Sequence, residues 1–126
     1  MVEMEMNKLT ERILKCAFKV HTELGPGLLE SAYEECLYFE LTKFGLNVSK
    51  QKALPLVYHE IKLEAGYRVD LLIENQVIVE IKSVEAINDV HAAQVLTYLK
   101  LSGCKVGLLL NFNVASLKNG IKRFVN

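Results

Sequence analysis

The sequence contains little cysteine. It has only Cys16, Cys36 and Cys104, which lie far apart and form no Cys-x-x-Cys pair. An odd number of isolated cysteines indicates neither a disulfide framework nor a zinc ribbon. Free cysteine is most often a buried thiol, and reduced thiols are typical of a cytoplasmic protein, which is the location that we expect.

An excess of charge of either sign is missing as well. Lysine plus arginine and aspartate plus glutamate each number 15, so the formal net charge is zero. Proteins that overall charge holds to nucleic acid are usually basic. A nucleic-acid site in this chain is therefore expected to be a local patch, to depend on a metal, or to bind with low affinity.

Long apolar runs and repeats are absent too. No stretch approaches the roughly 20 apolar residues of a membrane span, and segment 1–9 lacks the basic-then-apolar order of a signal peptide. We find no internal repeat, linker or low-complexity tract. The chain has 126 residues, of which 51% are apolar. This fits a single domain, residues 1–126, with no membrane partner.

The periodicity of the apolar residues indicates an α/β fold. Spacings of three and four fill the N-terminal third, β-branched and alternating runs follow, and a helical period returns near residue 87. Gly25 and Gly103 are predicted to end helices, and Asn75-Gln76 to form a hairpin turn. We expect helices over 7–24 or 10–24, 28–44 and 87–101, and strands over 47–60, 61–74, 76–84, 104–112 and 120–126. The order α-α-β-β-β-α-β-(β) predicts a mixed sheet flanked by helices.

Three charged residues interrupt strands that would otherwise be core. Asp70 lies before the predicted turn, and Glu80 and Lys82 lie after it. Glu80 and Lys82 are two positions apart and share a face, and a turn at 74–76 places Asp70 across from Glu80 or Ile81. Facing carboxylates repel one another unless a cation lies between them. Because Mg²⁺ binds through carboxylates, waters and substrate phosphates, the pattern favours metal-assisted hydrolysis of a phosphodiester.

At these residues the chain resembles the PD-(D/E)XK nuclease superfamily. Asp70 followed by Glu80-Ile81-Lys82 is similar to the Asp…Glu-x-Lys core of that superfamily, and Val69 stands where the family has proline. The resemblance implies a restriction-endonuclease-like fold. It also implies that Asp70, Glu80 and the Ile81 carbonyl hold Mg²⁺ or Mn²⁺, and that Lys82 serves the attacking water.

Two further segments are similar to elements of this superfamily. GLLESAY, which contains Glu30 and Tyr33, resembles the signature of the GxxExxY family, and QVLTY, from Gln94 to Tyr98, resembles the Gln-x-x-x-Tyr element of exonuclease-like members. The resemblance implies that Glu30 is a third acidic group near the metal and that Gln94 assists catalysis. We expect Tyr33 and Tyr98 to contact the substrate, with support of the helix as the other role open to Tyr98.

Structural alternatives stay open for these residues. Glu30 suits the N-terminal end of a helix dipole, Tyr33 suits core packing, and Gln94 suits packing with one amide hydrogen bond. The charged residues of the strands can also form a buried ion cluster, in which desolvation offsets much of the Coulombic gain.

The resemblance predicts a nuclease, a hydrolase that acts on nucleic acid, with DNA expected before RNA. The alternative is a non-catalytic nucleic-acid- or protein-binding module that retains the nuclease fold, which the small size and zero net charge favour. A homodimer is compatible with either function, because the last strand is expected at a sheet edge and edges invite pairing.

Overall fold

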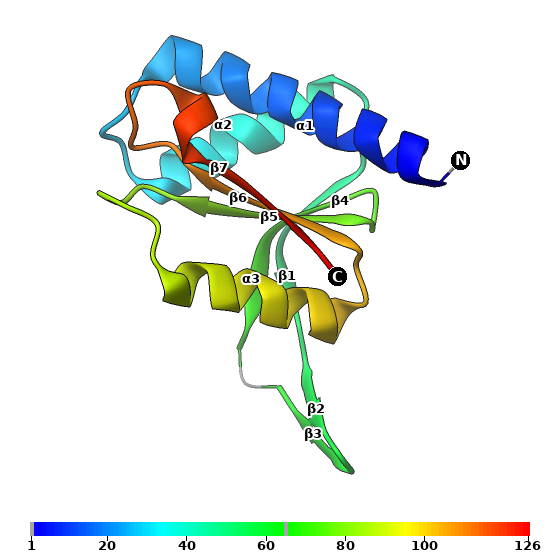
Figure 1. Ribbon diagram of the computed structural model, residues 1–126. Coiled ribbons are helices and arrows are strands. Elements are labelled where there is room, and N and C mark those ends of the chain that lie inside the picture. Colours follow the sequence, from blue (N-terminus) through cyan, green and yellow to red (C-terminus); the bar gives the residue numbers. More distant parts are fainter. Residues whose placement is uncertain (1, 65) are drawn as a thin grey trace.

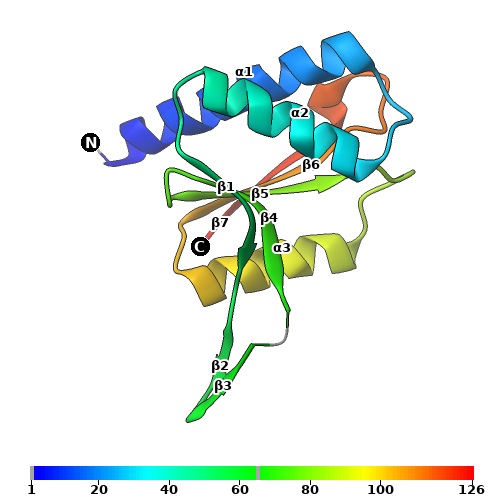
Figure 2. The ribbon, with the colours of Figure 1, turned by 180° about the vertical axis from the view of Figure 1, so that it is seen from behind.

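The computed structural model describes residues 2–64 and 66–126. In chain order its elements are α1 (Val2–Leu24), α2 (Glu30–Lys43), β1 (Val48–Ala53), β2 (Leu56–Tyr58), β3 (Ile61–Leu63), β4 (Arg68–Ile73), β5 (Val77–Lys82), α3 (Asp89–Ser102), β6 (Val106–Asn111), the 3₁₀ turn η1 (Leu117–Gly120) and β7 (Ile121–Val125). Strands β1-β4-β5-β6-β7 form a sheet in which only β5 and β6 are parallel. Helices α1 and α2 cover one face and α3 covers the other (Figures 1 and 2). The predicted α/β class, mixed sheet and element order are confirmed.

The structure adds a hairpin that the strand prediction did not separate. Segments 47–60 and 61–74 each divide into two strands. The second strand of the first segment, β2, and the first strand of the second segment, β3, pair only with one another. Pro55 lies at the break after β1, where it has no N–H to donate to a ladder. His59, with φ 53°, turns the chain at the tip. Figures 1 and 2 show this hairpin projecting from the body beyond α3.

Two helix starts differ from the prediction. Helix α1 begins at Val2 rather than at residue 7 or 10, because methionine and glutamate favour helix and no proline or glycine precedes Asn7. Helix α2 begins at Glu30 rather than Leu28, since Leu29 is still extended. In the described part of the chain, no helix combines the length and apolar character that crossing a bilayer requires.

Apolar side chains fill both faces of the sheet. Along β5, Val79 and Ile81 join the core beneath α1 and α2, whereas Ile78 joins the core beneath α3. This follows from the alternation of side chains along a strand. Each fully buried aliphatic side chain contributes roughly 1.5–3 kcal/mol, so β5 is firmly fixed in the middle of the sheet. Strand β6, buried at every position, is held equally well.

The turn between β4 and β5 sets the register of the charged residues. It is centred on Glu74 and Asn75, one residue earlier than predicted; both have φ 54°, and the N–H of Gln76 donates to Ile73 O at 2.9 Å. Two positive φ angles are typical of the two-residue turns that close hairpins. The resulting ladder pairs Leu71 with Val79, so the next residues outward are Asp70 and Glu80.

Candidate active site

The β4–β5 ladder opens where the two acids meet. The N–H of Asp70 donates to Glu80 Oε2 at 2.7 Å, and the N–H of Ile81 donates to Asp70 Oδ2 at 2.8 Å. Each carboxylate therefore accepts the bond that a backbone carbonyl would accept in a regular ladder. Their presence inside a hydrophobic hairpin is thereby explained, because the side chains complete the sheet at the point where it separates.

Burial keeps this pair of acids from ionising fully. It raises the pKa of Glu80 from 4.5 to about 8, with the charge of Asp70 as a second cause, while the bond from the Asp70 N–H opposes the rise. Burial also raises the pKa of Asp70, against the bond from the Ile81 N–H. Two neighbouring carboxylates share protons in this way unless a cation compensates their charge. The site is thus suited to receiving positive charge.

Lys82 supplies part of that charge. Its ammonium favours the ionised form of both acids and so partly offsets the raised pKa of Asp70 and of Glu80. Within residues 2–64 and 66–126, Lys82 forms no ion pair shorter than 4.0 Å. The three strand residues predicted from the sequence are therefore brought together, with the lysine free to contact a further group.

Glu30 reaches the same region from α2. Its Oε2 accepts from the N–H of Ser83 at 3.1 Å, and the Ser83 hydroxyl donates to Leu28 O at 2.6 Å. These bonds tie the start of α2 to the residue that follows Lys82. The charge of Glu30 also contributes to the raised pKa of Asp70. Glu30 accordingly lies near Asp70.

Tyr33 is placed differently from the other motif residues. Its side chain is fully buried and stacks on Phe112 with ring centroids 4.6 Å apart. Its hydroxyl donates to Gly25 O and accepts from the N–H of Leu28 at 3.1 Å. This environment favours the packing alternative, in which Tyr33 fixes the loop between α1 and α2.

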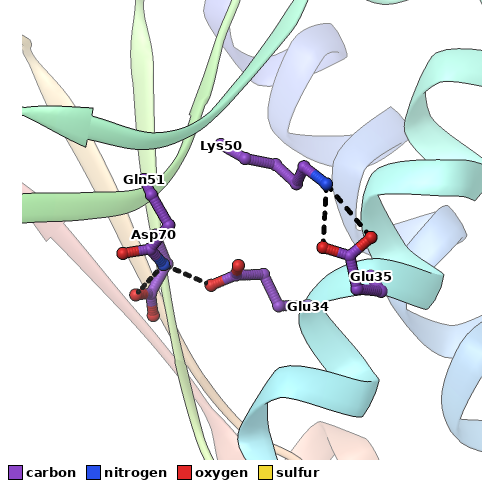
Figure 3. Close-up of polar contacts among 5 residues, drawn as sticks. All are labelled: Glu34, Glu35, Lys50, Gln51 and Asp70. Atoms are coloured by element: carbon purple, nitrogen blue, oxygen red, sulfur yellow. Dashed lines mark hydrogen bonds and ion pairs between the residues drawn. The ribbon is translucent and has the colours of Figure 1, made fainter.

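Two residues of the cluster were missed by sequence reasoning (Figure 3). Gln51 Nε2 donates to Asp70 Oδ1 at 3.2 Å and to Glu34 Oε1 at 2.7 Å. Burial raises the pKa of Glu34, and the charge of Asp70 adds to the rise. Glu34 could have been found, because it lies four positions after Glu30 on the same helical face. Gln51, with φ 50° on β1, offers no comparable signal.

Lys50, next to Gln51, is already engaged. Its Nζ lies 2.8 Å from Glu35 Oε1 (Figure 3) and 4.5 Å from the centre of the Tyr38 ring. These contacts hold Lys50 toward α2 and to one side of Asp70. The lysine that acts on the paired acids is therefore Lys82.

Helix α3 contributes the Gln-x-x-x-Tyr residues. Gln94 Nε2 lies 3.3 Å from the Tyr98 hydroxyl. Burial raises the pKa of Tyr98, and the charges of Glu80 and Asp70 add to the rise. Tyr98 is therefore near the acids, and Gln94 lies beside Tyr98. His91, three residues before Gln94, caps α3 together with Asn88.

A buried asparagine outside the motifs fixes the loop after β5. Asn111 Oδ1 accepts from the N–H of Val84 at 3.1 Å, and Asn111 Nδ2 donates to Val84 O at 3.0 Å. A polar residue at the end of an otherwise apolar run was its signal in the sequence. Its bonds hold the chain just beyond Lys82, so they position the cluster indirectly.

The donor atoms of the cluster fit a hard divalent cation. Within the described ranges, no group of three or more His, Cys, Asp and Glu side chains is arranged to hold a metal. Mg²⁺, however, usually takes one or two carboxylates and completes its shell with waters and substrate phosphates. Asp70 and Glu80 provide those carboxylates. Ile81 turns its side chain into the core, so only its backbone is available to a cation.

The comparisons with known proteins agree with this chemistry. A family model described as the PD-(D/E)XK nuclease superfamily matches residues 7–124, which include every residue of the cluster. Searches of curated proteins and of solved structures found no match.

Proposed function

Since this chain belongs to the PD-(D/E)XK nuclease superfamily, we propose that it is a divalent-metal-dependent nuclease that hydrolyses phosphodiester bonds. The carrying observation is that the carboxylates of Asp70 and Glu80 meet where the β4–β5 ladder opens, with the unpaired ammonium of Lys82 acting on both. The substrate is nucleic acid, and we propose DNA before RNA. Within the superfamily, GLLESAY supports assignment to the GxxExxY family.

Each residue of the cluster has a distinct part in this proposal. Asp70, Glu80 and the Ile81 carbonyl would hold Mg²⁺ or Mn²⁺. When bound, such an ion supplies a more acidic water and stabilises charge on the phosphate. Lys82 orients the attacking water and balances negative charge that develops on the phosphate. Glu30 would add a third carboxylate near the bound metal ion.

The remaining predicted residues shape the walls of the site. Gln94 and Tyr98 would form the α3 wall and contact substrate, and Gln51 would hold Asp70 Oδ1 in place through its amide. Tyr33 would act on folding instead, by fixing the loop before α2.

The test is cleavage of a panel of nucleic acids in the presence of Mn²⁺. The panel contains linear and circular, single- and double-stranded DNA and RNA. Asp70→Asn and Lys82→Ala should each lower the rate by about 100-fold or more, the usual effect of removing one catalytic group. Lys122→Ala, which removes a lysine from the far edge strand β7, is the matched control. Equal cleavage by all four proteins would contradict the proposal.

A specific observation also favours the second candidate, a binding module that retains the nuclease fold. Both acids accept backbone hydrogen bonds within the sheet, so they have a use without catalysis. Calorimetric titration with Mn²⁺ separates the two functions. A saturable site that disappears in Glu80→Gln supports the enzyme, and the absence of any such site supports the binding module.

We also propose a homodimer and a cytoplasmic location. Specific nucleic-acid interfaces bury about 1,000 Å² or more of protein, and a second copy would extend the surface of so small a chain. The edge strand β7 leaves Val125 66% exposed, and sedimentation equilibrium would detect a dimer. Cys16, Cys36 and Cys104 are free thiols, which supports a reducing compartment.

A further inference from the structure

A pocket beside the acidic cluster has no assigned role. It lies between α3 and the base of the β2–β3 hairpin and has a volume of about 200 Å³. Of its residues, only Gln94 and Tyr98 enter the proposed chemistry. The others are Leu56, Tyr67, Thr97 and Leu101.

The walls of the pocket suit a flat ring with polar edges. Leu56 and Leu101 are apolar, and Tyr67 is 44% exposed, which leaves its aromatic ring accessible. The Gln94 amide and the Thr97 hydroxyl are the polar groups beside them, and both can donate and accept hydrogen bonds. A nucleobase has this character, because its faces stack on aromatic side chains and its edge forms hydrogen bonds.

The position of the pocket connects it to the place of cleavage. Tyr98 belongs both to the pocket and to the surroundings of the acids: burial raises the pKa of its hydroxyl, and the charges of Glu80 and Asp70 add to the rise. Tyr67 immediately precedes β4, which begins at Arg68 and has Asp70 two residues later. Arg68 is exposed, and its guanidinium donates to Gln51 O at 3.1 Å. Arg68, a cation suited to a phosphate, thus lies in the chain between Tyr67 of the pocket and Asp70.

Resting on the proposed nuclease function, we propose that this pocket binds one unpaired nucleobase of the substrate next to the phosphodiester that is cut. In a duplex, stacking covers both faces of a base and pairing occupies its edge, so entry requires a base that is single-stranded, frayed or flipped out. The preferred substrate therefore contains unpaired nucleotides at the cleavage position, as in single strands and flaps.

The test measures binding without cleavage. Fluorescence anisotropy, with divalent metal removed, compares a short labelled single-stranded DNA, an abasic strand of the same length and a blunt duplex. The wild-type protein should bind the single strand most tightly. Tyr67→Ala should weaken that binding about 5- to 100-fold, the usual loss for one stacked base. Tyr67→Phe keeps the ring and should bind as the wild type does.

The matched control is Tyr58→Ala, which removes an exposed tyrosine from the hairpin outside the pocket. It should leave binding unchanged, and abasic DNA should bind equally weakly to all variants. A second readout needs no variant: 2-aminopurine in the strand should lose fluorescence on binding the wild-type protein, because stacking quenches it.

Several outcomes would overturn the proposal. They are equal binding by wild type and Tyr67→Ala, an equal loss in Tyr58→Ala, tightest binding of the duplex, or no binding of single strands. The two proposals fail separately. Cleavage that depends on Asp70 with no effect of Tyr67 refutes the base pocket alone, and binding that depends on Tyr67 without any cleavage refutes the nuclease alone.

Discussion

At the scale of single residues, Glu80 is a buried acid whose protonation is linked to stability. Its pKa in the folded protein is about 8, against an ordinary value of 4.5. Between these values the folded chain binds a proton that the unfolded chain releases. The contribution of neutral Glu80 to stability is therefore complete below about pH 4.5 and is lost as the pH rises through about 8.

This linkage predicts a pH dependence for the metal-free protein. The melting temperature should fall between about pH 5 and pH 9, and Glu80→Gln, which cannot ionise, should reduce the fall. Near pH 9 the variant should melt several degrees above the wild type, since ~1 kcal/mol corresponds to about 4 °C in a chain of this size. Thermal melts at each pH would measure the difference.

The control for this experiment is Glu11→Gln, which changes an exposed carboxylate on α1. Its pH profile should follow that of the wild type. If Glu80→Gln also follows the wild type, desolvation of Glu80 is not what couples protonation to folding.

The core of the site was predictable because it depends on local spacing. The short turn between β4 and β5 places Asp70 opposite Glu80. The alternation of side chains along a strand then puts Lys82 on the same face as Glu80. Gln51 was not predictable, because its contact with Asp70 depends on the β1–β4 register and on a positive φ. Long-range register of this kind leaves no short motif in the sequence.

At the scale of elements, the loop between α1 and α2 is held by one hydroxyl. Tyr33→Phe removes the group that bonds Gly25 O and the Leu28 N–H. The free energy of unfolding should fall by about 1–2 kcal/mol, the cost of leaving such groups unpaired. Urea denaturation would measure the loss, and affinity for Mn²⁺ and for nucleic acid should not change.

The matched control is Tyr38→Phe on the same helix. Tyr38 offers its ring to Lys50, and its hydroxyl makes no hydrogen bond within the described residues, so stability should stay within about 0.5 kcal/mol of the wild type. Unchanged stability with weaker nucleic-acid binding in Tyr33→Phe would restore the substrate-contact role first expected for this residue.

Elements were predictable where periodicity was strong and less so where it was interrupted. The β2–β3 hairpin was merged into longer strands because apolar residues continue through Leu56 and Ile61. Pro55 was the available sign of a break. The early start of α1 was missed because polar residues before Asn7 hide the helical period, although their propensity favours helix.

At the scale of the whole molecule, zero net charge limits how salt affects nucleic-acid binding. Apart from Lys50, which pairs with Glu35, the cations of β1, β4 and β5 are Lys52, Arg68 and Lys82. About three phosphate contacts predict a slope of log K against log salt near −2 for a single strand. Anisotropy titrations over a range of potassium chloride concentrations would give this slope.

Two lysines, one on each edge strand of the sheet, test which edge contacts the phosphates. Lys52→Ala should make the slope shallower by about 0.7, the value for one lost contact, whereas Lys122→Ala on the opposite edge strand should not alter it. A wild-type slope near −5 would require many more contacts and would contradict a small local site.

The opened β4–β5 ladder also bears on how relatives of this chain diverge. Asp70 and Glu80 close the sheet by accepting N–H bonds whether or not a phosphodiester is cut. Selection for folding alone should therefore retain both acids in descendants that have lost activity. The side chain of Lys82 makes no such hydrogen bond between the strands, so substitutions at this position are tolerated once a lineage no longer cleaves nucleic acid. Replacement of this lysine, rather than of either acid, is the expected mark of an inactive lineage.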